Sequence, residues 1–258
     1  MSNFIAWSKD SDNLQKSSSG GIFLELAKKT IENGGAVVGV IMDKRKSYYI
    51  FTHYLFAVKL MRGSKYLKAL LDNSVIWKMK HFKGEILFVG LPCQLKRVKR
   101  LFKERDNILY VELRCYGVIK KDIFNKHINK ICIEKNNYDI DKIKFRDKSF
   151  GWENSTVLHI DFDNFETYHR RDKLIEDFIS KKNIESRCKI CTSMGYGDII
   201  LGDYWKCPES FKNKSGTSKV VTNTDKGSKF FESLTNIESC KFNNHSHVNK
   251  VAIMKGSD

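Results

Sequence analysis

The chain has 258 residues, 41% of them hydrophobic, and its 46 Lys and Arg against 30 Asp and Glu give a formal net charge of +16. This length and apolar content allow one large folded domain or two small ones, and they exclude a disordered chain. No stretch of about 20 apolar residues is present, and the N-terminus lacks a secretory signal, so we expect a cytoplasmic protein without a membrane span. Its seven cysteines are then expected to be reduced.

The first half of the chain alternates predicted helices and strands. Ser18 and Ser19 precede an amphipathic helix that ends at Gly34-Gly35. The predicted elements that follow are strands over 36–42 and 48–54, a helix over 67–82, a strand over 85–89, a helix over 92–103 and a strand over 108–113. This alternation favours a parallel or mixed α/β sheet.

The pattern changes after a further predicted helix over 121–135. The segments "IKFRD", "STVLHIDFD" and "FETYHRR" are typical of strands, with Asn164 near a hairpin turn, and a helix over 172–183 follows. We therefore predict an α/β fold, a mixed sheet with flanking helices plus a smaller α+β C-terminal part. We place the division between residues 1–136 and residues 137–258.

Two cysteines lie at the predicted carboxyl ends of strands. In "GLPCQ", Pro92 suits the first helical position, so Cys93 falls in the first turn, where backbone N–H groups and the helix dipole favour a thiolate. Cys115 follows the next predicted strand. If the two strands are neighbours, about 4.8 Å apart, both sulfurs reach one site.

Cys188 and Cys191 form a C-x-x-C pair, a spacing that allows two thiolates to bind one metal centre. With Cys93 and Cys115 they make four candidate metal ligands. Structural zinc and an iron-sulfur cluster are both consistent with this spacing, and a redox-active dithiol at the C-x-x-C pair is a further alternative. The cysteines that lack a partner at ligand spacing are expected to be buried: Cys132, Cys207 and Cys240.

Seven segments of the chain, in this order, resemble the coenzyme F420 hydrogenase/dehydrogenase beta subunit family: "SSSGGIF", "GSKY", "GLPCQL", "LRCYGV", "FRDKSFGW", "CKIC" and "DIILGDYW". The resemblance extends from about Phe4 to the tail. It implies an α/β fold, a bound flavin, and a 4Fe-4S cluster held by four cysteines. The positions that match those cysteines are Cys93, Cys115, Cys188 and Cys191.

The resemblance also implies a redox activity. Better-known members move a hydride between a deazaflavin coenzyme and FAD and then pass electrons to iron-sulfur centres, while many bacterial relatives occur without that coenzyme, often beside polysaccharide-assembly enzymes. Many relatives begin with a ferredoxin-like segment that this chain lacks, so we expect its next electron carrier to be a separate protein. The loop from Gly195 to Asp198 departs from the family, which usually has a basic residue ahead of the aspartate.

Two loops are candidates for the flavin. Ser19, Gly20 and Gly21, with Ser18, offer hydroxyls and backbone N–H groups at a helix N-terminus, where a phosphate binds well, although a plain helix cap is the alternative. Gly63, Ser64 and Lys65 could meet a phosphate or the flavin ring, and a simple basic loop is equally compatible. No dinucleotide fingerprint or P-loop is present.

The remaining motifs are interpreted as structural. "FRDKSFGW" and "LGDYW" are expected to interlock through an Arg-Asp pair and packed tryptophans. The histidines, including His245 and His247, show no spacing typical of a metal site.

These observations predict an iron-sulfur flavoprotein oxidoreductase with FAD, or FMN, as its flavin and coenzyme F420 as one candidate substrate. Expected partners are a ferredoxin or another acidic carrier, steered by the positive surface, and the other subunits of a larger complex. The alternative is a non-catalytic, zinc- or cluster-stabilised basic module that binds nucleic acid or scaffolds polysaccharide assembly.

Overall fold

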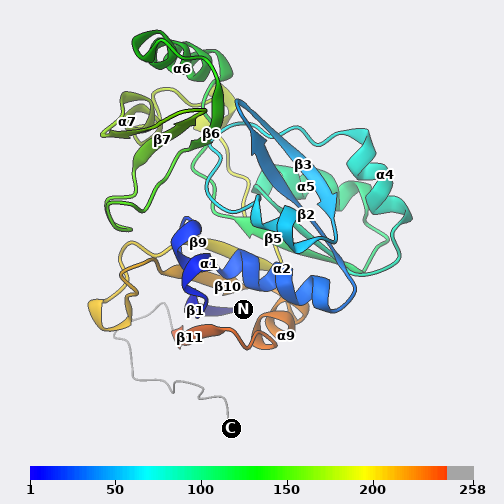
Figure 1. Ribbon diagram of the computed structural model, residues 1–258. Helices are drawn as coiled ribbons and strands as arrows, with labels where there is room; N and C mark the ends of the chain where they lie inside the picture. The colour runs from blue at the N-terminus through cyan, green and yellow to red at the C-terminus, as the bar shows by residue number, and fades with distance from the viewer. Residues whose placement is uncertain (243–258) are drawn as a thin grey trace.

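Two β-sheets of different size organise the computed structural model, which describes residues 1–242 (Figure 1). His245 and His247 lie outside the described residues. The large sheet has eight strands in the order β11-β1-β10-β9-β5-β4-β2-β3. These strands are β1 (Ser2–Ser8), β2 (Ala36–Asp43), β3 (Lys46–Thr52), β4 (Ile86–Gly90), β5 (Ile108–Leu113), β9 (Ile199–Asp203), β10 (Ser218–Thr222) and β11 (Ile237–Phe242).

The pairing within the large sheet is mixed. β2, β4, β5 and β9 run parallel to one another, whereas β3 at one edge and β10, β1 and β11 at the other pair antiparallel. The carboxyl ends of β4 and β5 therefore meet at the same edge of the sheet. This is the edge at which ligands usually bind in open α/β sheets.

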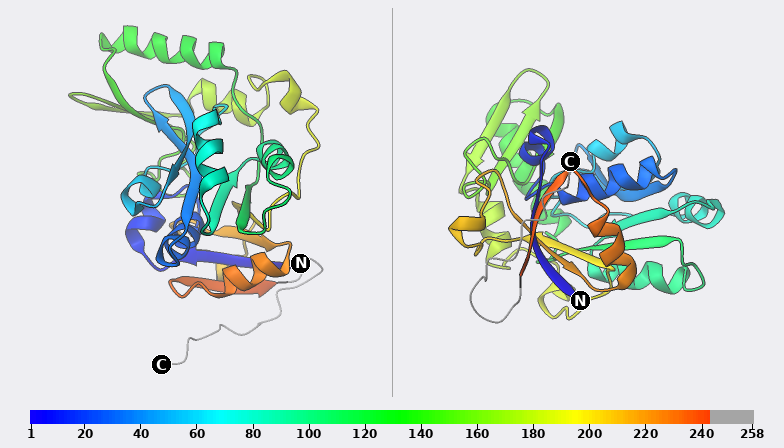
Figure 2. Two further views of the ribbon diagram at one scale, coloured as in Figure 1. Left: turned by 90° about the vertical axis from the view of Figure 1, so that its right-hand side faces the viewer. Right: turned by 90° about the horizontal axis from the view of Figure 1, so that it is seen from below.

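The small sheet is antiparallel and has the order β6-β7-β8. Its strands are β6 (Ile140–Lys144), β7 (Val157–Phe162) and β8 (Glu166–Arg170). Figure 2 shows α6 (Lys121–Lys135) near this sheet, at the end of the molecule away from β11. The predicted turn at Asn164 is confirmed, because this residue lies between the paired strands β7 and β8.

Helices cover both faces of the large sheet. On one face, α2 packs on apolar side chains such as Leu87 and Val89, and on the other, α4 and α5 pack on the alternate side chains, such as Ile86 and Phe88. In the described residues, the helices and one 3-10 turn are α1 (Ser11–Lys16), α2 (Ile22–Glu32), α3 (Leu55–Lys59), α4 (Asn73–His81), α5 (Pro92–Leu101), α6, α7 (Lys173–Ile179), α8 (Ser186–Lys189), η1 (Glu209–Phe211) and α9 (Asp225–Glu232). None of the helices in the described residues is long and apolar enough to cross a membrane.

The predicted fold class is confirmed, with differences in detail, such as the helix expected over 172–183, which ends at Ile179. The helix expected over 67–82 begins only at Asn73, because the Asp72 carboxylate accepts a hydrogen bond from the Val75 N–H and so caps the helix there. The expected division at residues 136 and 137 placed all later residues in the smaller part. In the structure β9, β10 and β11 return to the large sheet, because β9 pairs with β5 and the other two with β1.

Candidate functional site

Cys93 lies in the first turn of α5, directly after β4. Pro92 occupies the first helical position, as predicted, and the Leu91 N–H donates to Oε1 of Gln94 at 2.9 Å, which fixes the start of the helix. The Cys93 side chain is exposed. Contrary to the expected stabilisation of its thiolate, the pKa of Cys93 is raised, first by partial burial of the sulfur and next by the charge of the nearby Cys191. The positive charge of Arg187 and a hydrogen bond from the Cys93 backbone act in the opposite direction on this pKa.

Cys115 follows β5, which is the parallel neighbour of β4, as predicted. Its side chain is exposed at this edge of the sheet. Burial of the sulfur raises the pKa of Cys115 to about 11, against a backbone hydrogen bond at Gly117 that lowers it, and the charges of Cys93, Cys188 and Cys191 raise it further.

The C-x-x-C pair lies in and just after the short helix α8. The chain reaches α8 along the segment that follows Cys115: the Lys120 N–H donates to the Asn183 carbonyl and the Glu185 N–H to the Val118 carbonyl, each at 2.9 Å. This pairing brings Cys188 and Cys191 beside Cys115, although more than 70 residues separate them in the sequence.

Three separate segments thus bring four cysteines together. The sulfurs lie close enough for the charge of one cysteine to change the pKa of another. We call Cys93, Cys115, Cys188 and Cys191 the cysteine edge. Thiolates this close to one another repel, so several of them cannot ionise together without a compensating charge. A bound metal centre supplies that positive charge and binds cysteines as thiolates. The other three cysteines, Cys132, Cys207 and Cys240, are buried, as predicted.

Glu112 is a positioning residue that sequence reasoning missed. It is 2% exposed, and its carboxylate accepts three backbone hydrogen bonds, from Gly195 at 3.0 Å, Tyr196 at 2.6 Å and Gly197 at 3.2 Å. These bonds attach the loop after Cys191 to β5, three residues before Cys115. The signal in the sequence is the single acidic residue of "ILYVEL" together with the glycine-rich "GYG" that faces it.

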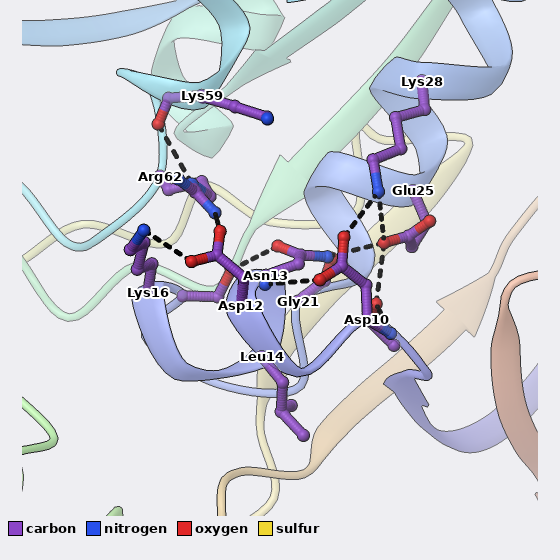
Figure 3. A network of polar contacts seen from close by, with 12 residues as sticks. Asp10, Asp12, Asn13, Leu14, Lys16, Gly21, Glu25, Lys28, Lys59 and Arg62 are labelled. Carbon is purple, nitrogen blue, oxygen red and sulfur yellow. Dashed lines mark hydrogen bonds and ion pairs between the residues drawn. The ribbon is translucent and has the colours of Figure 1, made fainter. Parts of the chain in front are cut away.

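The structure also brings together the two loops expected to bind a flavin, residues 17–21 and 62–66, which we call the serine loops. The hydroxyls of Ser18 and Ser64 share a hydrogen bond of 2.8 Å. Figure 3 shows that the second loop also bonds to α1, the helix that precedes the first loop: the Arg62 guanidinium donates to the Asp12 carboxylate at 3.2 Å. The two loops therefore form one surface.

Much of the first serine loop is bonded within the fold. The Ser19 hydroxyl donates to the Thr217 carbonyl at 2.7 Å, and the Gly20 N–H donates to the Ser218 hydroxyl at 3.0 Å. A Cβ atom on Gly20 would lie 2.4 Å from the Ala6 carbonyl oxygen, so glycine is required there for close packing of the chain. Gly21 is the N-cap residue of α2, with a positive φ of 76°, and its carbonyl accepts a hydrogen bond from the Asn13 amide at 2.9 Å (Figure 3).

In the second serine loop, Lys65 folds back onto its own segment. Its ammonium donates to the carbonyls of Met61 at 2.6 Å and Arg62 at 2.7 Å. Burial lowers the pKa of Lys65 to about 7, and the positive charge of Lys142 adds to this effect. Gly63 is exposed and has a φ of 81°, which explains the need for glycine at this turn.

The predicted interlock between "FRDKSFGW" and "LGDYW" is confirmed. Arg146 donates to the Asp203 carboxylate at 2.7 Å, and the rings of Trp152 and Trp205 stack with centroids 4.5 Å apart. The Trp152 indole N–H also donates to the Ser18 carbonyl at 3.1 Å. Through this hydrogen bond the two interlocked segments also hold the first serine loop in place.

The comparisons with known proteins agree with this fold. Residues 83–247 match the family model for the C terminus of the beta subunit of coenzyme F420 hydrogenase/dehydrogenase. The chain belongs to the coenzyme F420 hydrogenase/dehydrogenase beta subunit family. The matched range contains all four residues of the cysteine edge.

A solved structure shares the fold of this beta subunit family member. A chain of the F420-reducing [NiFe] hydrogenase complex from Methanosarcina barkeri, studied by xenon derivatization, superposes with a TM-score of 0.63. The two are 16% identical, and the match covers 93% of this chain and 81% of that one. No protein of curated function matches the sequence.

Proposed function

We propose that the chain is an iron-sulfur flavoprotein subunit that passes electrons between a hydride donor or acceptor, a flavin and a 4Fe-4S cluster. The observation that carries this proposal is the cysteine edge, where thiols from three segments lie near one another beside two parallel strand ends. A flavin exchanges hydride as an electron pair and a cluster exchanges single electrons, so the two together supply the conversion between them.

In this proposal Cys93, Cys115, Cys188 and Cys191 hold the cluster. Within the described residues, no three of these sulfurs lie within 4.8 Å of one another. A closed zinc site with Zn–S bonds of about 2.3 Å holds its sulfurs only about 3.8 Å apart. The wider arrangement supports a larger occupant than a single zinc ion.

The serine loops are the proposed flavin site, with FAD preferred and FMN possible. Ser64 and the backbone at Gly63 are the groups best placed to contact the flavin phosphate, because Ser19 and Gly20 already bond within the fold. Burial lowers the pKa of Lys65 to about 7, and a phosphate anion bound beside its ammonium would raise this pKa and favour the charged form. An anionic phosphate is favoured next to such charge.

The proposed redox partners follow from the positive charge of the protein surface and from the family to which the chain belongs. Coenzyme F420, named in the family description, is one candidate hydride partner. The exposed side of α5 is basic, with Lys96, Arg97 and Arg100 following Cys93 in the same helix. This positive charge favours binding of an acidic partner such as a ferredoxin. The same surface could also contact another subunit of a larger complex.

Anaerobic purification tests the proposal. We expect a coloured protein with about four iron and four sulfide per chain and one bound flavin. A colourless protein with one zinc and no flavin would contradict it and favour the alternative, a zinc-stabilised basic module without catalytic activity. Salt-dependent binding to nucleic acid would then be the next measurement.

A further inference from the structure

The small sheet carries a polar cluster on one face. Leu158 and Ile160 of β7 point into the core shared with α6 and α7, so the alternate residues His159 and Asp161 point to the other face. Asp161 pairs in register with Glu166 of β8. The sheet therefore places one imidazole and two carboxylates side by side.

One side-chain atom from each of these three residues lies within 4.8 Å of the others. Nε2 of His159 is 2.5 Å from Oδ1 of Asp161 and 3.2 Å from Oε2 of Glu166. His159 is 2% exposed, yet neither its Nε2 nor Oδ1 of Asp161 has a hydrogen-bond partner. Buried polar atoms in proteins are almost always satisfied, so these two atoms require an explanation.

The other ring nitrogen of His159, Nδ1, has two polar neighbours, Asp147 and Lys144. Nδ1 lies 2.8 Å from Oδ2 of Asp147, and the Ser149 N–H and hydroxyl hold the second oxygen of that carboxylate. Lys144 also lies 3.0 Å from Nδ1, but an ammonium cannot donate to a protonated nitrogen. Donation from Nδ1 to Asp147 leaves Nε2 as a lone pair that faces two carboxylates.

A lone pair between two carboxylates is repulsive unless a positive charge lies among them. A proton on Nε2 would supply that charge and could be shared with Oε2 of Glu166 at 3.2 Å, but Oδ1 of Asp161, at 2.5 Å, is not positioned to accept a hydrogen bond from it. A metal ion has no such directional requirement on the carboxylate side. A histidine whose second nitrogen donates to a carboxylate is also the usual arrangement around a bound metal.

We propose that His159, Asp161 and Glu166 form a binding site for a divalent transition-metal ion. One nitrogen and two carboxylate oxygens suit Mn²⁺, Fe²⁺ or Zn²⁺. With metal–ligand bonds of about 2.1 Å, adjacent ligand atoms lie about 3 Å apart, so Asp161 needs to move away from His159 by only about half an ångström.

Two neighbours shape the proposed site. The Tyr168 ring stacks on His159 with centroids 4.0 Å apart, and its hydroxyl donates to Glu166 at 2.5 Å, so this residue fixes both ligands. Lys144 lies 3.8 Å from the other oxygen of Asp161. Its charge limits the affinity for the metal, so we expect reversible binding.

Mn²⁺ is the probe for this site, because it prefers imidazole and carboxylate to the thiolates of the cysteine edge. Anaerobically purified wild-type protein is titrated with Mn²⁺, and the free ion is followed by its EPR signal. We expect saturable uptake of one Mn²⁺ per chain, and at least about tenfold weaker uptake by Glu166→Gln and by Asp161→Asn. Glu166 is more than half exposed, so its variant should fold.

Asp163→Asn is the matched control, since Asp163 lies in the same hairpin and accepts hydrogen bonds only from Asn137 and Asn164 in the described residues. It removes the same charge and should leave Mn²⁺ uptake unchanged. Absence of saturable uptake by the wild type, or equal uptake by all variants, would overturn the proposal and leave a protonated His159 as the occupant. Iron content plays no part in this readout, so the result is independent of the proposed redox function.

Discussion

The cysteine edge and the serine loops both carry candidate ligand residues, but their polar groups are engaged in different ways. At the cysteine edge the side chains of Cys93 and Cys115 are exposed, and their pKa values respond to the other cysteines of the set. In the serine loops, Ser19, Gly20 and Lys65 bond to carbonyls and hydroxyls of the chain itself. Two equally distinctive sequence motifs therefore differ in how many of their polar groups the fold itself uses.

The largest expected effect is at the cysteine edge. Replacing Cys93 with Ser removes one of four proposed cluster ligands, and we expect most of the iron and sulfide to be lost while the fold is retained, because the side chain is exposed. Iron and sulfide assays on anaerobically purified protein, with circular dichroism for the fold, provide the measurement.

Cys207→Ser is the control for this experiment. Cys207 is buried, and its thiol donates to the Phe211 carbonyl, a bond that a serine hydroxyl can keep. Its iron content should equal that of the wild type. Equal iron content in Cys93→Ser would instead remove Cys93 from the ligand set.

The second prediction concerns the residue that holds the cysteine edge in place. In the wild type, three backbone N–H groups donate to the Glu112 carboxylate. In Glu112→Gln an amide NH₂, which cannot accept these hydrogen bonds, replaces one carboxylate oxygen. We expect the free energy of unfolding to fall by about 2–3 kcal/mol, the usual cost of disrupting hydrogen bonds to a buried charge. Urea denaturation measures the change.

Iron content gives Glu112→Gln a second readout, since the loop it anchors leads from Cys191. We expect less iron than in the wild type, and Glu104→Gln, at an exposed glutamate, should change neither stability nor iron. A stable Glu112→Gln protein with full iron would show that the loop holds its position without this carboxylate.

The third prediction separates a ligand contact from a fold contact within the serine loops. Ser64→Ala removes a hydroxyl from the proposed phosphate contact and its hydrogen bond with Ser18, and we expect flavin affinity to fall about two- to tenfold. Ser19→Ala removes the donor to the Thr217 carbonyl, so we expect lower stability and nearly unchanged flavin affinity. Flavin fluorescence titration and urea denaturation distinguish the two, and the reverse pattern would exchange their roles.

The sequence predicted best what is encoded locally. The strand over 108–113 and the helix over 121–135 have the bounds that periodicity indicated, and Pro92 begins α5 as its fixed φ requires. The start of α4 was missed because the capping carboxylate of Asp72 overrides an apolar pattern that extends further upstream. A capping residue such as Asp72 can be found in the sequence. The sequence does not show whether the cap or the apolar periodicity sets the start of the helix.

What the sequence could not supply is long-range pairing. The return of β9 to β5 depends on contacts between residues about 90 positions apart, which no local pattern encodes. The same holds for Glu112 and its loop, and for His159, whose partners Asp161 and Glu166 become a cluster only when β7 and β8 pair. A search for histidine spacing alone does not reveal a site made by one histidine and two carboxylates.

The last prediction tests whether the cysteine edge exchanges electrons with an acidic partner. Arg97 is exposed on α5, one turn after Cys93, whereas Lys83 is exposed at the opposite end of β4. We expect Arg97→Glu to slow reduction by an acidic ferredoxin about three- to tenfold at low salt, because steering depends on charge near the docking point. Lys83→Glu changes the net charge equally and should have little effect. The difference should vanish at about 1 M salt, where the Debye length is only about 3 Å, and stopped-flow measurements across ionic strengths provide the test. If both variants slow the reaction equally, overall charge rather than the basic side of α5 guides the partner, and docking next to the cysteine edge loses its support.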